Sequence, residues 1–247
     1  MIKRPEKSDW FYTLSEQDQM SQGDLEEYLE VGENGIKLCI EAMGDKKPAT
    51  ILDFPSGHGR VLRWMKNQWP EATIYAAEVD ADALDFTTKT FGSRPIQDDG
   101  RLNMKLPTGL DLIFSGSLLT HFDDWQIEKF LEICIEALAP GGVLVFTAHG
   151  RLASLLAKKK HPVYGDLIDT TELYKNYLDG GFSFIPYSAD YPTYGLTLTS
   201  PEWLVSKITK IPMARITSVQ EAGWGHQDVY FVQKHIWALH EDAPSYR

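Results

Sequence analysis

The sequence predicts an α/β fold built on a doubly wound sheet of seven strands. Three observations carry this prediction. Residues 50–69 read as a short apolar strand, a glycine turn and a helix. Strand-like and helix-like segments then alternate as far as residue 150, which is typical of a parallel sheet with crossover helices. Two further strand patterns, 214–220 and 228–233, follow each other at the end of the chain and predict a closing antiparallel hairpin.

The first of these segments predicts a nucleotide-type binding element. Ile51, Leu52 and Phe54 form an apolar run too short for a helix, as in a buried parallel strand. Gly57 and Gly59 then allow a tight turn and a close approach of the backbone to a ligand. The helix that follows places one apolar face toward the sheet, formed by Val61, Leu62, Met65 and Trp69. Its free N–H groups are suited to a nucleotide.

The spacing disfavours two common nucleotide-binding motifs. A dinucleotide fingerprint needs a third glycine three residues after the second, but position 62 is Leu. The Gly-Lys-Ser or Gly-Lys-Thr of a phosphate-binding loop is also absent.

The second strand, Ala72–Ala77, is followed by two acids that compete for one role. A carboxylate at the end of this strand is placed to accept hydrogen bonds from both hydroxyls of a ribose. Glu78 lies 19 residues beyond Gly59 and is the favoured candidate. Asp80 is the alternative, although its position before the helix 81–91 is explained by an N-cap.

The other elements before residue 150 are predicted from turn residues and helix caps. A helix over Asp24–Met43 is expected to be interrupted or bent near Gly32 and Gly35. Short strands are expected at 94–97 and 110–114. Asp123 begins a helix with Gln126 placed for a capping box. Residues 138–142 predict a turn, and residues 143–146 the fifth strand.

These motifs together resemble the class I S-adenosylmethionine-dependent methyltransferases. Asp53, Gly57 and Gly59 match the acid-x-Gly-x-Gly-x-Gly motif of that family, with Pro55 in place of its first glycine. The Leu-x-Pro-Gly-Gly-x-Leu run at 138–144 is a common signature of the same class. The runs Asp-Phe-Pro-x-Gly-His-Gly-Arg and His-Gln-Asp-Val-Tyr resemble a bacterial subset of these enzymes. The resemblance implies a Rossmann-like sheet whose last strand is antiparallel.

The resemblance also implies S-adenosyl-L-methionine as the cofactor and a set of residues that hold it. In the family, an acid after the third strand accepts the adenine amino group, here Asp98 or Asp99, although an acidic turn explains the same residues. The loop after the fourth strand lies beside the reactive methyl. The expected cofactor-binding residues are Asp53, Pro55, Ser56, Gly57, Gly59, Glu78, Val79, Asp98, Asp99, Ser115 and Gly116.

The chain is expected to form a single domain with four parts: a helical segment at 1–48, the cofactor half at 49–150, a cap insertion at 151–211 and the closing strands at 212–235. An insertion after the fifth strand leaves from the carboxyl edge of the sheet, where such folds bind ligands. It holds six of the chain's eleven tyrosines, which either line a pocket or pack the cap. Tyr191, Tyr194 and Trp224 are the expected acceptor-binding residues. The tail from His235 is expected to be a surface extension.

Four histidines follow strand ends and are expected to face one cleft: His58, His121, His149 and His226. Their spacing does not match a metal site, so none is predicted. If the acceptor is a hydroxyl, a general base assists its deprotonation. The candidates, in order, are His121, His149 and His226, while a structural role stays open for each.

Composition limits the partners. The net charge of −11 disfavours binding to nucleic acid or to an anionic membrane. No apolar run reaches the roughly 18 residues of a membrane span, and no signal peptide is recognisable. Cys39 and Cys134 are expected to be buried thiols. These features predict a soluble, cytoplasmic protein.

The sequence therefore predicts a methyltransferase that acts on a small molecule, with O-methylation of a sugar or natural product favoured over N-methylation. A non-catalytic S-adenosylmethionine-binding or scaffold protein is an alternative, because Pro55 alters the motif. A nicotinamide-dependent oxidoreductase is a further alternative, which Leu62 and the closing hairpin disfavour.

Overall fold

The sheet has seven strands in the order β3-β2-β1-β4-β5-β9-β8. The computed structural model describes residues 2, 4–5, 9–21, 24–161 and 168–235. The strands of this sheet are β1 (Thr50–Asp53), β2 (Thr73–Glu78), β3 (Arg94–Gln97), β4 (Leu110–Ser115), β5 (Leu138–Ala148), β8 (Ala214–Trp224) and β9 (Gln227–Lys234). β1 to β5 are mutually parallel, and β9 is antiparallel to both of its neighbours. The predicted fold class, with its closing antiparallel strand, is confirmed.

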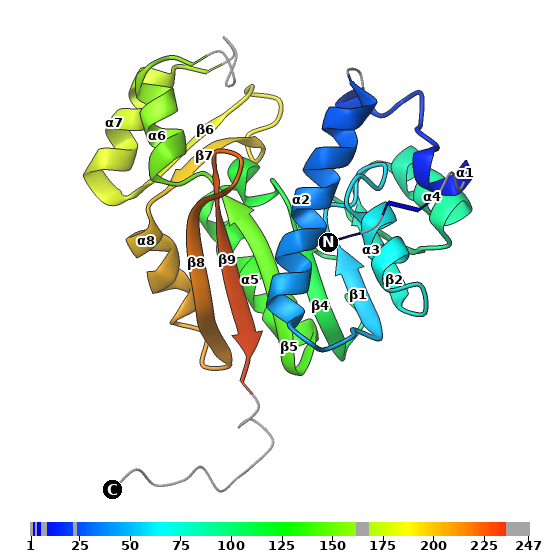
Figure 1. Ribbon diagram of the computed structural model, residues 1–247. Coiled ribbons are helices and arrows are strands. Elements are labelled where there is room, and N and C mark those ends of the chain that lie inside the picture. Colours follow the sequence, from blue (N-terminus) through cyan, green and yellow to red (C-terminus); the bar gives the residue numbers. More distant parts are fainter. Residues whose placement is uncertain (1, 3, 6–8, 22–23, 162–167, 236–247) are drawn as a thin grey trace, which may run out of the picture.

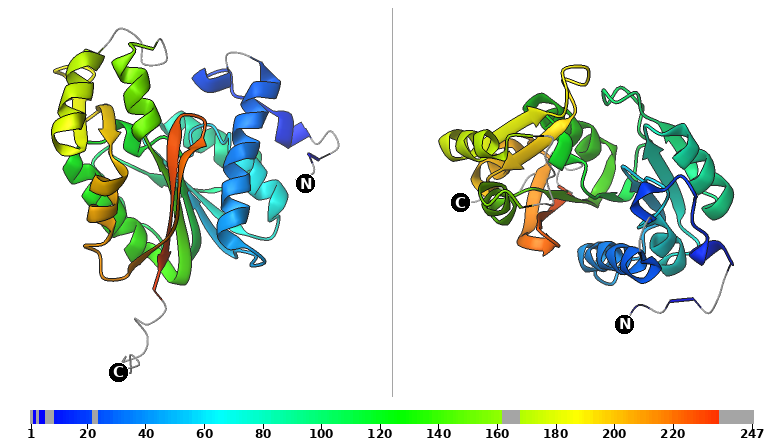
Figure 2. Two further views of the ribbon diagram at one scale, coloured as in Figure 1. Left: turned by 60° about the vertical axis from the view of Figure 1, so that its left-hand side comes forward. Right: turned by 90° about the horizontal axis from the view of Figure 1, so that it is seen from above.

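Helices cover both faces of this sheet, as Figures 1 and 2 show. Side chains alternate along each strand, so that neighbours such as Ile51 and Leu52 enter separate apolar cores. One core packs against α1 (Asp9–Tyr12), α2 (Leu25–Met43), α3 (Leu62–Gln68) and α4 (Ala81–Phe91). The other core packs against α5 (Asp124–Ala137) and α8 (Pro201–Ile208).

The elements between β5 and α8 form a separate layer above the carboxyl edge of the sheet (Figure 1). We call this layer the cap. Its elements are α6 (Arg151–Lys158), α7 (Thr170–Gly180), β6 (Phe182–Pro186) and β7 (Gly195–Thr199). β6 and β7 pair as a two-stranded antiparallel sheet. Leu173, Leu196 and Leu198 belong to a third, smaller apolar cluster inside this layer.

Several local predictions are confirmed. Asp80 begins α4 by accepting a hydrogen bond from the Asp82 N–H. Asp123 and Gln126 form the expected capping box at α5. Cys39 and Cys134 are free, buried thiols. The predicted extension after His235 lies outside the described residues.

Two local predictions are wrong. The predicted interruption of α2 near Gly32 and Gly35 is wrong: the helix is continuous, and these glycines serve close packing. A Cβ on Gly32 would lie 2.3 Å from the backbone oxygen of Arg60. The predicted turn at 138–142 is instead the start of β5, because Leu138 pairs with Leu110 before the register shifts toward Leu112.

The close approach at Gly32 predicts an asymmetric effect of alanine. Gly32→Ala must push α2 away from the backbone at Arg60 and is expected to destabilise the fold by roughly 1–3 kcal/mol. The matched control is Gly180→Ala at the end of α7, where a Cβ meets nothing within 4 Å. That change is expected to be neutral or mildly stabilising, since Ala is the better helix former. Urea unfolding measures both variants, and equal midpoints would contradict the packing argument.

Candidate functional site

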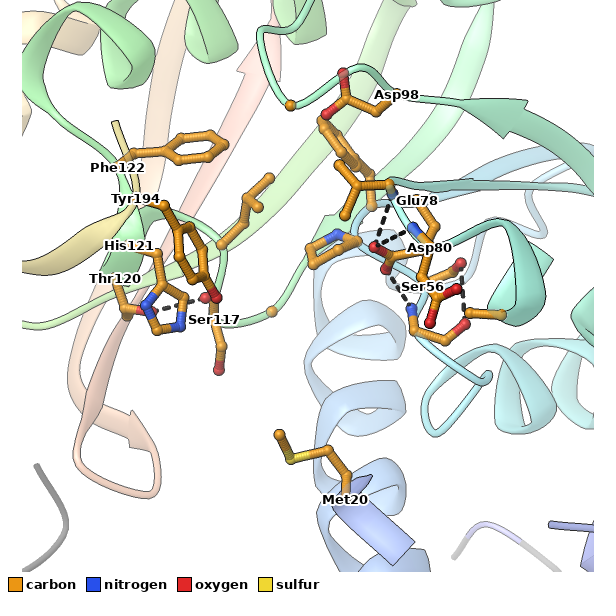
Figure 3. Close-up of a pocket in the computed structure, with 18 of the residues that line it drawn as sticks. Met20, Ser56, Glu78, Asp80, Asp98, Ser117, Thr120, His121, Phe122 and Tyr194 are labelled. Carbon is orange, nitrogen blue, oxygen red and sulfur yellow. Dashed lines mark hydrogen bonds between the residues drawn. The ribbon is translucent and has the colours of Figure 1, made fainter. Parts of the chain in front are cut away.

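A cavity of about 1180 Å³ opens between the carboxyl edge of the sheet and the cap. Its walls come from the loops that follow β1 to β5, from η1 (Gln19–Ser21), from the cap and from the β8–β9 turn. In Figure 3, Ser56, Glu78, Asp80 and Asp98 lie on one side of it, while Thr120, His121, Phe122 and Tyr194 lie on the other. The cavity therefore has two halves. We call the first the acidic half. We call the second the acceptor half, because its tyrosines were expected to bind the methyl acceptor.

The glycine turn after β1 is held in place by Glu78. One carboxylate oxygen of Glu78 accepts the Gly57 N–H at 2.8 Å, and the other accepts the Val79 N–H at 2.8 Å. Gly57 and Gly59 have φ angles of 48° and 81°, a region that favours glycine. The Phe54–Pro55 peptide bond that opens this turn is cis. Ser56, Gly57 and Pro55 line the acidic half, whereas Gly59 lies behind it against Phe91.

The structure gives the two acids after β2 separate positions. Glu78 ends the strand, is buried, and lines the cavity. Asp80 also lines the cavity, but its Oδ1 accepts the Asp82 N–H at 2.9 Å as the cap of α4. Between them, Val79 is an apolar side chain that stays 55% exposed at the cavity wall. This arrangement favours Glu78 as the ribose-binding acid and Val79 as a contact for a flat ring.

The acids after β3 also differ. Oδ1 of Asp98 is buried and has no hydrogen-bond partner among the described residues. Burial raises the pKa of its carboxyl above the ordinary value. Asp99 is exposed and is occupied within its own loop, where it accepts hydrogen bonds from the Arg101 N–H and the Asn103 side chain. Asp98 is therefore the better placed of the two to bind a ligand's amino group.

A second unpaired carboxylate oxygen lies at the end of β1. Oδ2 of Asp53 is buried without a hydrogen bond in the described structure. The pKa of Asp53 is raised well above its ordinary value, first by burial and then by the neighbouring charge of Glu78. A bound cation would relieve this unfavourable burial.

Sequence reasoning missed two residues that line the cavity, Arg60 and Asp18. Arg60 lines the cavity with its guanidinium over the rings of Tyr28 and Trp224, at 5.9 and 6.0 Å, and no described acid lies within salt-bridge distance of it. Asp18 accepts the Tyr28 hydroxyl at 2.7 Å and lies 4.0 Å from His58. The position of Arg60, directly after the glycine motif, was a usable signal. Asp18 comes from a segment with no periodic pattern.

Two predicted site residues lie deeper than expected. Ser115 is fully buried at the end of β4, and the cavity lining passes from Phe114 to Gly116, so the expected contact from the Ser115 side chain is not supported. Trp224 does line the cavity, but only 9% of it is exposed. Its indole N–H donates to the Val31 oxygen of α2, and its ring packs against Gly116. Trp224 therefore braces the cofactor half as well as bounding the cavity, and an alanine there would not be a clean test of acceptor binding.

All four predicted histidines line the cavity, each from a different loop. His58 packs near Phe86 at the acidic half. His121 ends η2 (Leu119–His121), and its Nδ1 lies 3.0 Å from the Gly195 oxygen and 2.9 Å from the Tyr187 hydroxyl. Burial lowers the pKa of His121, so its neutral form is favoured. The described residues contain no group of three metal-type ligands.

His149 and His226 form a pair at the other end of the acceptor half. Nδ1 of His149 lies 3.2 Å from the Thr197 oxygen, and the Nε2 atoms of the two rings lie 3.3 Å apart. The rings stack with 5.2 Å between their centroids. Burial, followed by the nearby histidines, lowers the pKa of His149 to about 3, and burial also lowers the pKa of His226. Both are therefore uncharged at neutral pH.

The cap supplies aromatic walls. Tyr191 and Tyr194 line the cavity and are 68% and 47% exposed. The ring of Tyr194 packs on His121 with 4.9 Å between centroids, and Tyr187 packs beside both. Tyr187 is a wall residue that was not singled out from the sequence, because it is one of many tyrosines in that segment.

The acidic half fits S-adenosylmethionine on its own observations. Asp53 and Asp98 each have a buried carboxylate oxygen without a hydrogen bond. Such oxygens can accept hydrogen bonds from an ammonium group and from an adenine amino group. Arg60 offers a cation to a carboxylate. A Cβ on Gly57 would meet nothing within 4 Å, so the turn leaves open space for a ligand at that point.

Part of the chain resembles known methyltransferases. Residues 52–144 match a family model described as a methyltransferase domain. A malonyl-[acyl-carrier protein] O-methyltransferase of Xylella fastidiosa is 29% identical over 122 residues, which are 48% of this chain and 41% of the relative. The chain thus spans less than half the length of that curated relative.

Solved structures share the fold. A protein of Pyrococcus horikoshii aligns with a TM-score of 0.62 at 11% identity, covering 93% of this chain and 100% of the other. A 1,6-didemethyltoxoflavin-N1-methyltransferase of Burkholderia thailandensis, solved with bound 1,6-didemethyltoxoflavin and S-adenosylhomocysteine, aligns with a TM-score of 0.58 at 12% identity, covering 86% of this chain and 81% of the other. Residues 52–144 thus match a methyltransferase domain, and most of the chain shares its fold with these solved structures.

The separate positions of Glu78 and Asp80 predict that two isosteric changes will affect cofactor binding differently. Glu78→Gln removes a charge that strengthens hydrogen bonds to a ribose and places an amide against the Gly57 N–H. Binding of S-adenosylhomocysteine is expected to weaken by roughly 1–3 kcal/mol. Asp80→Asn keeps a capping oxygen and is expected to leave binding nearly intact. Calorimetric titration measures both, and the reverse ranking would assign the ribose to Asp80.

The buried, neutral state of His149 predicts acid sensitivity. In the unfolded chain this histidine takes up a proton near pH 6.5, whereas in the fold it does so only near pH 3. Its contribution to stability is therefore complete above about pH 6.5 and is lost as the pH falls toward 3, at up to about 1.4 kcal/mol per pH unit. His149→Gln should flatten this part of the stability curve. Urea unfolding at several pH values measures the slope, and an unchanged slope in the variant would contradict the burial argument.

Proposed function

We propose that this chain transfers the methyl group of S-adenosylmethionine to a hydroxyl oxygen of a small molecule. The observation that carries the proposal is the arrangement of the cavity. A site suited to the cofactor and an aromatic, histidine-lined site meet in one space, with the loop at Gly116 and Ser117 between them. When bound, the cofactor supplies an activated methyl group, and the electron pair of the broken C–S bond stays on sulfur.

The chain's residues divide the binding of the cofactor between them. Glu78 takes the ribose hydroxyls, Val79 packs on the adenine, and Asp98 accepts its amino group. Arg60 pairs with the carboxylate of the methionine part, and Asp53 lies where it can offset the ammonium. Gly57 and Ser56 bring the backbone close. This assignment uses both unpaired carboxylate oxygens of the acidic half, those of Asp53 and Asp98.

His121 is the proposed general base. A deprotonated oxygen is the better nucleophile, and a neutral imidazole within reach of the hydroxyl assists loss of its proton. The contact of Nδ1 with the Gly195 oxygen requires a hydrogen on Nδ1, since a carbonyl can only accept. The lone pair is then on Nε2, which is left to receive the proton. His149 and His226 are occupied with each other at 3.3 Å and are proposed to orient the acceptor.

The acceptor is proposed to lie between the cap tyrosines and the β8–β9 turn. Tyr191, Tyr194 and Trp224 give the cavity flat apolar walls, while Gln227 and Thr120 supply polar groups. Alignment of the acceptor and exclusion of water are the main contributions that such a site makes to methyl transfer. A small ring compound of the natural-product or sugar type suits these walls.

The proposal predicts a split between binding and turnover. After the acceptor is found by screening hydroxylated compounds for release of S-adenosylhomocysteine, His121→Gln should lower kcat by roughly 10²–10⁴-fold. Affinity for S-adenosylhomocysteine should stay within about twofold, because His121 does not contact the acidic half. Tyr191→Ala should instead raise the KM for the acceptor. Calorimetry that detects no binding of S-adenosylmethionine or S-adenosylhomocysteine to the folded protein would refute the proposal.

A further inference from the structure

β7 contacts two histidines with alternate carbonyl groups. The Gly195 oxygen lies 3.0 Å from Nδ1 of His121, and the Thr197 oxygen lies 3.2 Å from Nδ1 of His149. Residues two apart on a strand present their carbonyls on the same side. β7 pairs with β6 along one edge only, so these carbonyls belong to its free edge. The histidines thus occupy hydrogen-bonding positions that a further strand would otherwise take.

These contacts decide which nitrogen of each ring carries hydrogen. A carbonyl oxygen can only accept, so Nδ1 must be the N–H nitrogen in both rings, and Nε2 must hold the lone pair. The Tyr187 hydroxyl, 2.9 Å from the same Nδ1 of His121, shares that hydrogen. His226 then donates from its Nε2 to Nε2 of His149. Nε2 of His121, in the cavity wall, is an acceptor with no hydrogen bond to the described residues.

The acceptor half also lacks fixed positive charge. Arg60 and Arg101 are the arginines among the described lining residues, and no lysine is among them. Arg60 lies over Tyr28 and Trp224, and Arg101 follows the acidic turn after β3, beside Asp98 and Asp99. The acceptor half itself holds neutral histidines, tyrosines, Thr120 and Gln227. A carboxylate placed there would be desolvated without a counter-ion, which is strongly unfavourable.

We infer that β7 sets the tautomers of His121 and His149 so that the acceptor half selects an uncharged, hydroxyl-bearing ring and rejects carboxylates. The inference rests on the proposed function, because it names the substrate class of the same site. The ring would lie against Tyr194 and Tyr187, and its hydroxyl would donate to Nε2 of His121. Specificity of this kind comes from unpaired acceptors and missing cations, which penalise the wrong ligand.

The first experiment measures the tautomers directly. Long-range proton–nitrogen spectra of protein with ¹⁵N-labelled histidine distinguish the two forms of each ring, and His121→Gln and His149→Gln assign the signals. We expect the Nδ1–H form for both rings, with or without S-adenosylhomocysteine. An Nε2–H form for either ring would overturn the inference. This readout does not need a methyl acceptor, so it can fail while methyl transfer stands, and only the role of His121 as the general base would fall with it.

The second experiment tests selection with a matched pair of ligands. Phenol and benzoate are titrated at neutral pH into protein saturated with S-adenosylhomocysteine. Phenol should shift the Nε2 signal of His121 and bind at least about tenfold more tightly than benzoate, a difference of about 1.4 kcal/mol. His121→Gln should reduce that preference, because it removes the Nε2 acceptor for phenol while the lack of a counter-ion for benzoate remains. Equal or tighter binding of benzoate, or no effect of phenol on the Nε2 signal, would overturn the inference.

Failure of the cofactor to bind gives a separate outcome. Titration of S-adenosylhomocysteine by calorimetry precedes both experiments. Without binding, the proposed function fails, and the ligand pair is then titrated into the free protein. A preference for phenol there would leave the selectivity of the acceptor half in place without a methyl-transfer role.

Discussion

The carboxylate of Glu78 connects the end of β2 to the glycine turn after β1, and the cofactor half depends on both. Glu78 ends β2, and its side chain accepts the backbone N–H groups of Gly57 in the neighbouring loop and of Val79 in its own. An acceptor with two oxygens has about four lone-pair positions, so these bonds leave capacity for further donors. The same side chain thus shapes the glycine turn and remains able to bind a ligand. Hydrogen bonds to a charged carboxylate are stronger than hydrogen bonds to a neutral oxygen.

The parallel order of β1 to β5 explains why these groups meet at all. Parallel strands place their carboxyl ends at one edge, so Asp53, Glu78, Asp98, Gly116 and His149 approach each other although they are spread over about a hundred residues of sequence. β9 runs antiparallel between β5 and β8, which brings the β8–β9 turn to the same edge. Trp224 and His226 enter the cavity by this route. The topology, more than any single contact, assembles the site.

The cap shapes the cavity with its side chains and also forms hydrogen bonds with the histidines of the site. The free edge of β7 supplies carbonyls to His121 and His149, and Thr197 also donates its hydroxyl to the Phe122 oxygen at 2.6 Å. These bonds attach the cap to the end of η2 and to the residue that follows β5. They also make the histidines hydrogen-bond acceptors toward the cavity. A surface insertion therefore determines how protons are arranged at the candidate reaction centre.

The sequence by itself determined the features that depend on local spacing. The apolar run before Gly57, the capping box of Asp123 and Gln126, and the cap at Asp80 are interactions between near neighbours, and each was predictable. Even the ranking of Glu78 over Asp80 followed from a cap that explained one acid and left the other. The continuity of α2 could not be predicted, because the reason for Gly32 is the backbone oxygen of Arg60, in the turn that leads into α3. Tertiary structure alone decided the depth of Trp224, the partners of Asp18 and the tautomers of His121 and His149. Those properties depend on atoms that are distant in sequence, and only the folded chain brings them within hydrogen-bonding range.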